Sequence, residues 1–183
     1  MISRRTFIAS GVAATAAACT PIDVAPVITV DNYMDYIPDR HWSDHFSSVR
    51  QGAIICDTGS RALYHWTPGG DVHTRYPTSV PRSPEFTRLG RTQVVRKQVG
   101  PTWRPTPRML RENPDWPRVV EPGPNNPLGS HAMYLTWPAY LIHGTEDNNK
   151  IGRLASSGCI GLRNEDIATV YAATNIGCPV ILI

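Results

Sequence analysis

The sequence predicts a single, mainly β domain with one short helix before its last strand. Segments of strand composition, bounded by glycine, proline and other turn residues, recur from about residue 50 onwards. A helical spacing of apolar residues is found near the end of the chain. Proline is frequent, at 17 of 183 residues, which favours loops and strands over a bundle of helices.

The first two predicted strands form a hairpin. Residues 53–57 and 62–66 are apolar segments on either side of a turn at 58–61. Further strands are expected around 75–76 and at 92–99, 132–135, 139–143 and 179–183. Within 139–143, the period of two places Leu141 and His143 on one face of the strand and Tyr140 and Ile142 on the other.

The helix is predicted to begin at Asn164, a residue suited to an N-cap, and to stop at Gly177. Its apolar positions follow the spacing i, i+3, i+4, i+7 and are Ile167, Val170, Tyr171 and Thr174. Residues 101–129 contain eight prolines, so neither a regular strand nor a helix is expected there. A long irregular connection in a compact domain is usually functional or disordered, and we expect a lid over a binding cleft.

Residues 1–19 have the features of an export signal. Arg4 and Arg5 precede a short, weakly apolar run ending in three alanines, and this run is shorter than the roughly 20 residues that span a bilayer. The arginine pair resembles a twin-arginine signal, with an ordinary secretory signal as the alternative. Cys19 follows the alanines as in a lipoprotein box, so lipidation and simple cleavage both stay open. Either places the protein in the periplasm or cell envelope, touching a membrane only through a lipid anchor.

Residues 20–45 are polar and weakly patterned, as expected of a linker or arm, and the folded domain is predicted over 46–183. The formal charge of +3 is too small to indicate a nucleic-acid partner, and no nucleic-acid motif accompanies it. Positive residues concentrate between Arg82 and Arg118. They fit either a solvated face or a surface that attracts an anionic polymer or substrate carboxylates.

The cysteines of the domain differ in their surroundings. Cys56 and Cys178 lie in apolar strand segments; an extracytoplasmic location permits a disulfide between them, which the sequence leaves open. Cys159 follows Gly158, and His143 ends a strand beside Gly144. A nucleophilic thiolate needs an adjacent base and donors for the oxyanion, which these residues supply, although a buried structural cysteine and histidine are the alternative. A zinc site is less favoured, since no Cys-x-x-Cys pair occurs.

A resemblance to a known family decides between these interpretations. The segments His143-Gly144-Thr145 and Ser156-Ser157-Gly158-Cys159-Ile160 are similar to the signature of the YkuD-type L,D-transpeptidase catalytic domain. Further similar segments are 101–107, 126–129, 151–152 and 163–166. The resemblance covers roughly residues 50–183 and implies a β-sandwich-like fold with the cysteine at the base of a cleft.

The resemblance also implies an activity without metal or organic cofactor. Cys159 would be the nucleophile, His143 its base and Gly144 the carbonyl that orients the base, with amides at Gly158 and Cys159 facing the oxyanion. The cysteine would take an acyl group from a peptidoglycan tetrapeptide stem as a thioester. An amine of another stem, or of a protein to be anchored to the wall, would then receive it. Carbapenem-type inhibitors are expected to acylate the same cysteine.

Two other functions stay open. A peptidoglycan carboxypeptidase or endopeptidase would form the same acyl-enzyme and pass it to water, and an inactive module would only bind the wall. The sequence departs from the family pattern at Ser157, where many members have histidine, and at Gly161, where arginine is usual. Arg163 lies two residues further on, and we expect it to replace the missing guanidinium in part.

Overall fold

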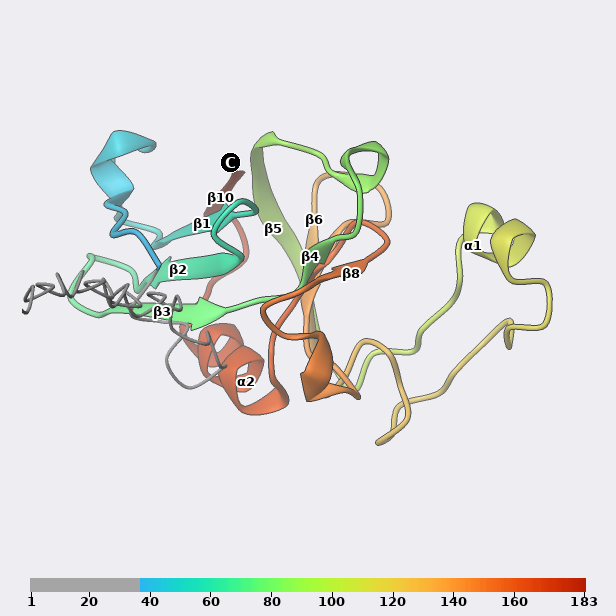
Figure 1. Ribbon diagram of the computed structural model, residues 1–183. Helices are drawn as coiled ribbons and strands as arrows, with labels where there is room; N and C mark the ends of the chain where they lie inside the picture. Colours follow the sequence, from blue (N-terminus) through green and yellow to red (C-terminus); the bar gives the residue numbers. More distant parts are fainter. Residues whose placement is uncertain (1–36) are drawn as a thin grey trace, which may run out of the picture.

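The computed structural model describes residues 37–183, so the predicted export signal and Cys19 lie outside the described residues. Eight strands form one curled sheet in the order β3-β2-β1-β10-β5-β6-β7-β9, and β4 with β8 forms a separate pair (Figure 1). The strands are β1 (Ala53–Asp57), β2 (Ala62–Trp66), β3 (His73–Pro77), β4 (Val80–Pro81), β5 (Gly90–Val99), β6 (His131–Leu135), β7 (Leu141–His143), β8 (Leu154–Ser156), β9 (Ile160–Gly161) and β10 (Pro179–Leu182). The predicted mainly β fold is confirmed, and the hairpin β1–β2 has the predicted bounds.

The middle of the sheet is assembled from distant parts of the sequence. β10 lies between β1, to which it is parallel, and β5, to which it is antiparallel. β1 is buried along its whole length, because its alternate side chains enter two different apolar clusters. Ile54 belongs to the main core beside α2, and Ile55 packs on the other face with Tyr64 and Trp66.

The longer helix, α2 (Asn164–Ala173), precedes the last strand as predicted, although its ends differ from the prediction. It packs against the sheet (Figure 1). Arg163 is the N-cap and Asn164 the first helical residue. The helix ends at Ala173, with Thr174 as its C-cap, and does not continue to Gly177. The C-terminal carbonyls of α2 are held by Lys97, whose Nζ donates to the carbonyls of Tyr171 and Thr174 at 2.5 Å each. A cation at this end of a helix also opposes the negative pole of the helix dipole.

Buried His65 ties the same end of α2 to β2. Its Nε2 lies 3.1 Å from Oγ1 of Thr174, and that hydroxyl donates to the carbonyl of Val170 at 2.7 Å. The hydroxyl proton is therefore used, so Nε2 of His65 must be the donor. Burial lowers the pKa of His65 to about 4, and the ring is neutral at physiological pH.

The expectation that residues 101–129 hold no helix is wrong. α1 (Pro107–Glu112) lies within this stretch, and Thr106 caps it by accepting from the amide of Met109 at 3.3 Å. Pro107 does not interrupt α1, because it occupies the first helical turn, where its missing N–H would have no intrahelical partner. Short 3-10 helices are η2 (Trp42–Asp44), η3 (Pro84–Phe86) and η4 (Asn148–Lys150).

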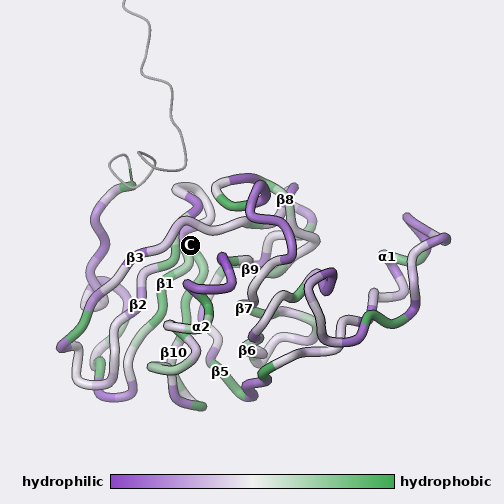
Figure 2. The backbone as a smooth tube through the Cα atoms, turned by 90° about the horizontal axis from the view of Figure 1, so that it is seen from below, coloured by the Kyte–Doolittle hydropathy of each residue, from purple (hydrophilic) through white to green (hydrophobic). Residues whose placement is uncertain are grey.

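Residues 101–129, called here the projecting segment, leave the sheet between β5 and β6 and extend away from the body (Figures 1 and 2). Trp103 and Val120 pair at its base through two backbone hydrogen bonds of 2.9 Å. Asn126, near the end of this segment, is fully buried. Its Nδ2 donates to the carbonyls of Pro101, Val120 and Glu121, and its Oδ1 accepts from the amide of Leu128. One side chain thus fixes both ends of an otherwise irregular segment.

Cys56 and Cys178 are buried and both thiols are free, which answers the question of the disulfide that the sequence left open. Both side chains belong to the main apolar core. Across residues 37–183, no helix is long and apolar enough to cross a membrane.

Candidate active site

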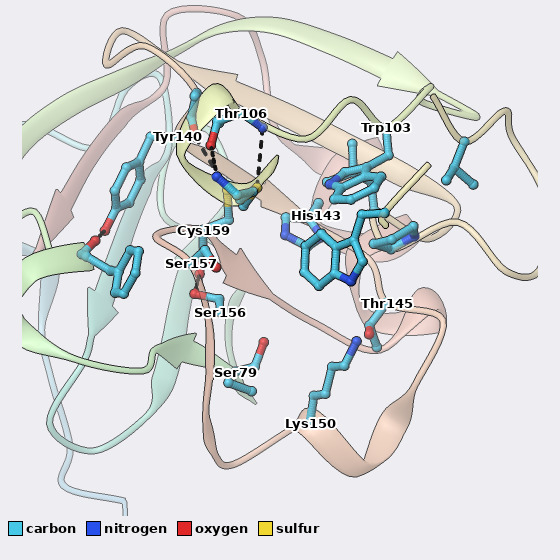
Figure 3. A pocket seen from close by; sticks show the side chains of 18 of the residues that line it. Ser79, Trp103, Thr106, Tyr140, His143, Thr145, Lys150, Ser156, Ser157 and Cys159 are labelled. Atoms are coloured by element: carbon cyan, nitrogen blue, oxygen red, sulfur yellow. Dashed lines mark hydrogen bonds between the residues drawn. The ribbon is translucent and has the colours of Figure 1, made fainter. Parts of the chain in front are cut away.

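Strands β7 and β9 bring His143 and Cys159 to the same face of the sheet. The two strands are parallel, with Ile142 opposite Ile160 and His143 opposite Gly161. Because the isoleucines point into the core, the alternation of a strand turns His143 and Cys159 to the opposite face as diagonal neighbours. Both line one cleft of about 590 Å³, and Figure 3 shows the two side chains there.

The imidazole of His143 is held by a backbone carbonyl. Nδ1 donates to the carbonyl of Gly144 at 2.5 Å, because a carbonyl oxygen only accepts. This bond fixes the tautomer and leaves Nε2 unprotonated and able to accept a proton from the cleft. Burial lowers the pKa of His143 to about 4, against the smaller opposing effects of the Gly144 carbonyl and of Glu146.

The thiol of Cys159 is neutral in the resting state. Burial raises its pKa to about 11, and Sγ donates to the carbonyl of Ala139 at 3.6 Å. With the pKa of His143 near 4, thiol and imidazole both stay uncharged across the neutral range. The site therefore holds no preformed thiolate–imidazolium pair.

The loop that presents Cys159 is held by Ser156. Its hydroxyl donates to the carbonyl of Cys159 at 2.5 Å and accepts from the amide of Gly158 at 3.2 Å. Gly158 has a φ of +140°, and a β-carbon there would lie 3.3 Å from the ring of Tyr140. Only glycine combines this backbone conformation with such a close neighbour. The Gly158 amide, expected at the oxyanion, is bonded to Ser156 in the free protein.

Asn164 supports the histidine from behind, a role that the sequence did not reveal. Its Oδ1 accepts from the amide of Ser130 and its Nδ2 donates to the carbonyl of Thr145, both at 2.9 Å. A β-carbon on Gly129 or on Gly144 would lie 2.2 Å from this Oδ1. In the sequence, Asn164 is recognisable only as a residue suited to the start of a helix, which does not indicate its contacts near His143.

Gly161 replaces the arginine usual in the family pattern, and its surroundings are compact. It exchanges two backbone hydrogen bonds with Ser79, of 2.8 and 3.0 Å. A β-carbon on Gly161 would lie only 2.3 Å from the hydroxyl oxygen of Ser79. Arg163, expected to supply a guanidinium in part, is the N-cap of α2 and lies outside the wall of the cleft.

A second cavity of about 500 Å³ adjoins the first and also reaches Cys159. The two cavities share Cys159, Ala139 and four residues of the projecting segment, which are Trp103, Thr106, Met109 and Leu128. The wall of the first contains the ion pair Glu146–Lys150, at 2.6 Å. The second is lined by Arg96 and Arg104 and by the ring of Tyr134. Within residues 37–183, no cluster of three His, Cys, Asp or Glu side chains is arranged to hold a metal ion.

Comparison with known proteins places this geometry in a family. The model of the YkuD family, described as the L,D-transpeptidase catalytic domain, matches residues 51–182. The chain belongs to the YkuD family of L,D-transpeptidases. The predicted family resemblance is thereby confirmed.

The matches to relatives cover different fractions of the relatives' own length. The ORF 5 product from the ATP synthase subunits region of Fuscovulum blasticum is 47% identical over 98% of this chain and 96% of its own length. The ErfK/SrfK and YbiS proteins of Escherichia coli, both named as L,D-transpeptidases, are 37% and 36% identical. Those matches cover 74% and 73% of this chain but only 45% and 44% of the relatives.

Solved L,D-transpeptidases share the fold of this chain. An L,D-transpeptidase from Mycobacterium smegmatis matches with a TM-score of 0.57 at 20% identity, over 73% of this chain and 58% of the other. The L,D-transpeptidase LdtMt1, determined in complex with imipenem, matches with a TM-score of 0.55 at 18% identity, over 73% and 59% of the two chains.

Proposed function

We propose that this family member is a peptidoglycan L,D-transpeptidase that forms a thioester at Cys159. The proposal rests chiefly on one observation: Cys159 lies where two cavities meet, and His143, whose Nε2 is able to accept a proton, lines the first of them. An acyl transfer needs an acyl donor and an amine acceptor, and two cavities that share the nucleophile can hold one of each. No metal or organic cofactor takes part in the proposed reaction.

The proposed first half-reaction acylates the cysteine. Nε2 of His143 takes the thiol proton as Sγ of Cys159 attacks the carbonyl of the third residue of a tetrapeptide stem, and a carbon–sulfur bond forms. The amide of Cys159 stabilises the oxyanion, joined by that of Gly158 when it leaves its long bond to Ser156. The intermediate collapses, the C–N bond breaks, and the departing amine takes the proton from His143.

The proposed second half-reaction transfers the acyl group. An amine of another stem, or of a protein to be anchored, attacks the thioester and passes a proton to His143. The C–S bond breaks and the proton returns to Sγ, which restores the enzyme. Water in place of the amine would give hydrolysis, the alternative activity.

Intact-protein mass spectrometry tests the proposal. The domain is incubated with a tetrapeptide stem or with a carbapenem, and wild type is compared with Cys159→Ala and His143→Ala. We expect an adduct that requires Cys159 and that forms at least a hundredfold more slowly without the base, since general acid–base catalysis contributes roughly 10²–10⁴-fold. Hydrolysed product alone, despite abundant amine, would assign a hydrolase. No adduct on folded protein would favour an inactive wall-binding module.

We further propose that the protein works in the periplasm or cell envelope, where its substrate lies. The proposal is supported by the signal-like residues 1–19, and Cys19 is the proposed lipid anchor. Labelling with a radioactive fatty acid, in wild type and Cys19→Ser, would test the anchor; equal labelling of both would exclude it.

A further inference from the structure

Two arginines converge on one carboxylate at the rim of the cleft. Arg82 donates from Nη2 to Oε2 of Glu112 at 2.8 Å, and Arg108 donates from Nε to Oε1 of the same carboxylate at 2.9 Å. Both guanidinium groups also lie over the ring of Phe86, 4.4 and 4.0 Å from its centre. The ring and the shared carboxylate hold the two cations close together.

The cluster touches the loop that carries the nucleophile. Arg82 donates from Nη1 to the hydroxyl of Ser157 at 3.0 Å, and Ser157, Phe86 and Arg108 all line the cleft that contains Cys159. Ser157 is two residues from Cys159, within about 7 Å of chain. A group attached one residue beyond a carbonyl at Cys159 therefore falls within the reach of a long arginine side chain.

The bond between Glu112 and the arginines is weak enough to be exchanged. The side chains of Arg82, Arg108 and Glu112 are 39%, 49% and 35% exposed, and exposed ion pairs contribute little to stability. Arg82 belongs to the body of the domain, whereas Arg108 and Glu112 both belong to α1. A carboxylate arriving in the cleft could take the place of Glu112 without leaving a buried charge unpaired.

The local charges leave room for one incoming anion. Glu85 lines the cleft and accepts a hydrogen bond from the hydroxyl of Ser83. This bond, and to a smaller extent the charge of Arg108, lowers the pKa of Glu85. With Glu112 displaced, two guanidinium groups would face the single carboxylate of Glu85. One positive charge would then be free to bind a substrate carboxylate in a charge-assisted hydrogen bond.

We propose that Arg82 and Arg108 form a binding site for the C-terminal carboxylate of the donor peptide, which Glu112 occupies in the free enzyme. The inference rests on the proposed function and names how its substrate is recognised. The leaving residue of a tetrapeptide carries a free carboxylate one residue beyond the bond that is broken. Its binding replaces the contact that joins α1 to Arg82, so recognition of the donor and movement of the projecting segment are coupled.

The test measures the concentration dependence of Cys159 acylation with synthetic tetrapeptides whose third residue is a diamino acid with a side-chain carboxylate. Three otherwise identical forms are compared: the free acid, its C-terminal amide, and the form in which the side-chain carboxylate is replaced by an amide. For wild type, we expect the C-terminal amide to raise KM about tenfold and the side-chain amide to leave it unchanged. Arg82→Gln and Arg108→Gln should raise KM for the free acid by a similar factor and lose the discrimination between acid and C-terminal amide. Glu112→Gln should lower KM for the free acid severalfold, because the internal competitor has lost its charge.

Two matched variants control for charge and for changes in the projecting segment. Arg111→Gln removes a cation from the same helix, and Glu121→Gln removes a carboxylate that accepts a hydrogen bond from Thr102; neither should alter KM. Equal KM values for acid and C-terminal amide in wild type would overturn the carboxylate site while leaving the transpeptidase proposal intact. Discrimination only against the side-chain amide would also overturn it, by assigning the arginines to another carboxylate. Absence of acylation by every stem would overturn the proposed function and this inference together.

Discussion

Replacement of Asn164 by alanine tests whether the geometry of the site depends on support from behind the histidine. The variant loses the acceptor of the Ser130 amide and the donor to the Thr145 carbonyl. Thr145 follows Gly144, whose carbonyl holds Nδ1 of His143. The change therefore acts on the base through two residues of backbone, without touching substrate.

The expected cost follows from two lost hydrogen bonds and two partly buried groups left without these partners. Such losses amount to roughly 2–4 kcal/mol of unfolding free energy, which in a domain of this size lowers Tm by roughly 5–12 °C. A displacement of the Gly144 carbonyl by even 1 Å would slow acylation by roughly ten- to a hundredfold. The exposed Asn175→Ala is the matched control and should change the unfolding free energy by no more than about 0.5 kcal/mol.

Thermal unfolding and the acylation rate of Cys159 check this prediction, and a second substitution sharpens it. Gly144→Ala places a methyl group 2.2 Å from Oδ1 of Asn164 in wild type, but not in Asn164→Ala. The combined variant should therefore be more stable than the sum of the single effects indicates, by roughly 0.5–3 kcal/mol. Strict additivity, or an Asn164→Ala enzyme with unchanged Tm and rate, would refute the reasoning.

Three further predictions concern charge. The pKa of His65 is about 4 in the folded protein, below its ordinary 6.5, so the unfolded chain binds the proton first. Its contribution to stability therefore falls by roughly 3 kcal/mol as pH drops from about 6.5 to 4. In His65→Gln, denaturant unfolding should lose this contribution and keep the similar one of His143, whose pKa is lowered to the same value. The pKa values of about 4 for His143 and about 11 for Cys159 predict that the protein shows no thiolate ultraviolet absorbance at pH 7. They also predict that the acylation rate declines only as His143 becomes protonated near pH 4. A thiolate signal at pH 7 would contradict the neutral pair. Lys97→Met should destabilise the domain by roughly 1–3 kcal/mol, because two helix-terminal carbonyls lose a charged donor, and unchanged denaturant unfolding would exclude that role.

The sequence was most informative where local pattern and tertiary packing agree. The hairpin β1–β2 was predicted with its bounds because a buried apolar segment, a polar turn and a second apolar segment leave few alternatives. The number of prolines does not predict α1, because proline disrupts a helix only beyond its first turn. Thr106 followed by Pro107 is a capping residue with proline in the first turn, where proline is tolerated.

The candidate site could be predicted only in part. No local pattern shows that β9, only two residues long, pairs in parallel with β7, and it is this pairing that brings Cys159 to His143. The family resemblance supplied what periodicity could not. The supporting contacts of Asn164 and the ion pair between Arg82 and Glu112 join residues distant in sequence, so they become apparent only in three dimensions.

The central position of β10 has a consequence for folding. Ile54 pairs with Val180, and Thr92 pairs with the same residue from the other side, so the two parts of the sheet join only when residues 179–182 are in place. Before then β1 exposes an apolar edge that can pair with another chain. Contacts so distant in sequence make folding slow. A nascent chain of this protein would therefore benefit from chaperone protection until β10 has been synthesised.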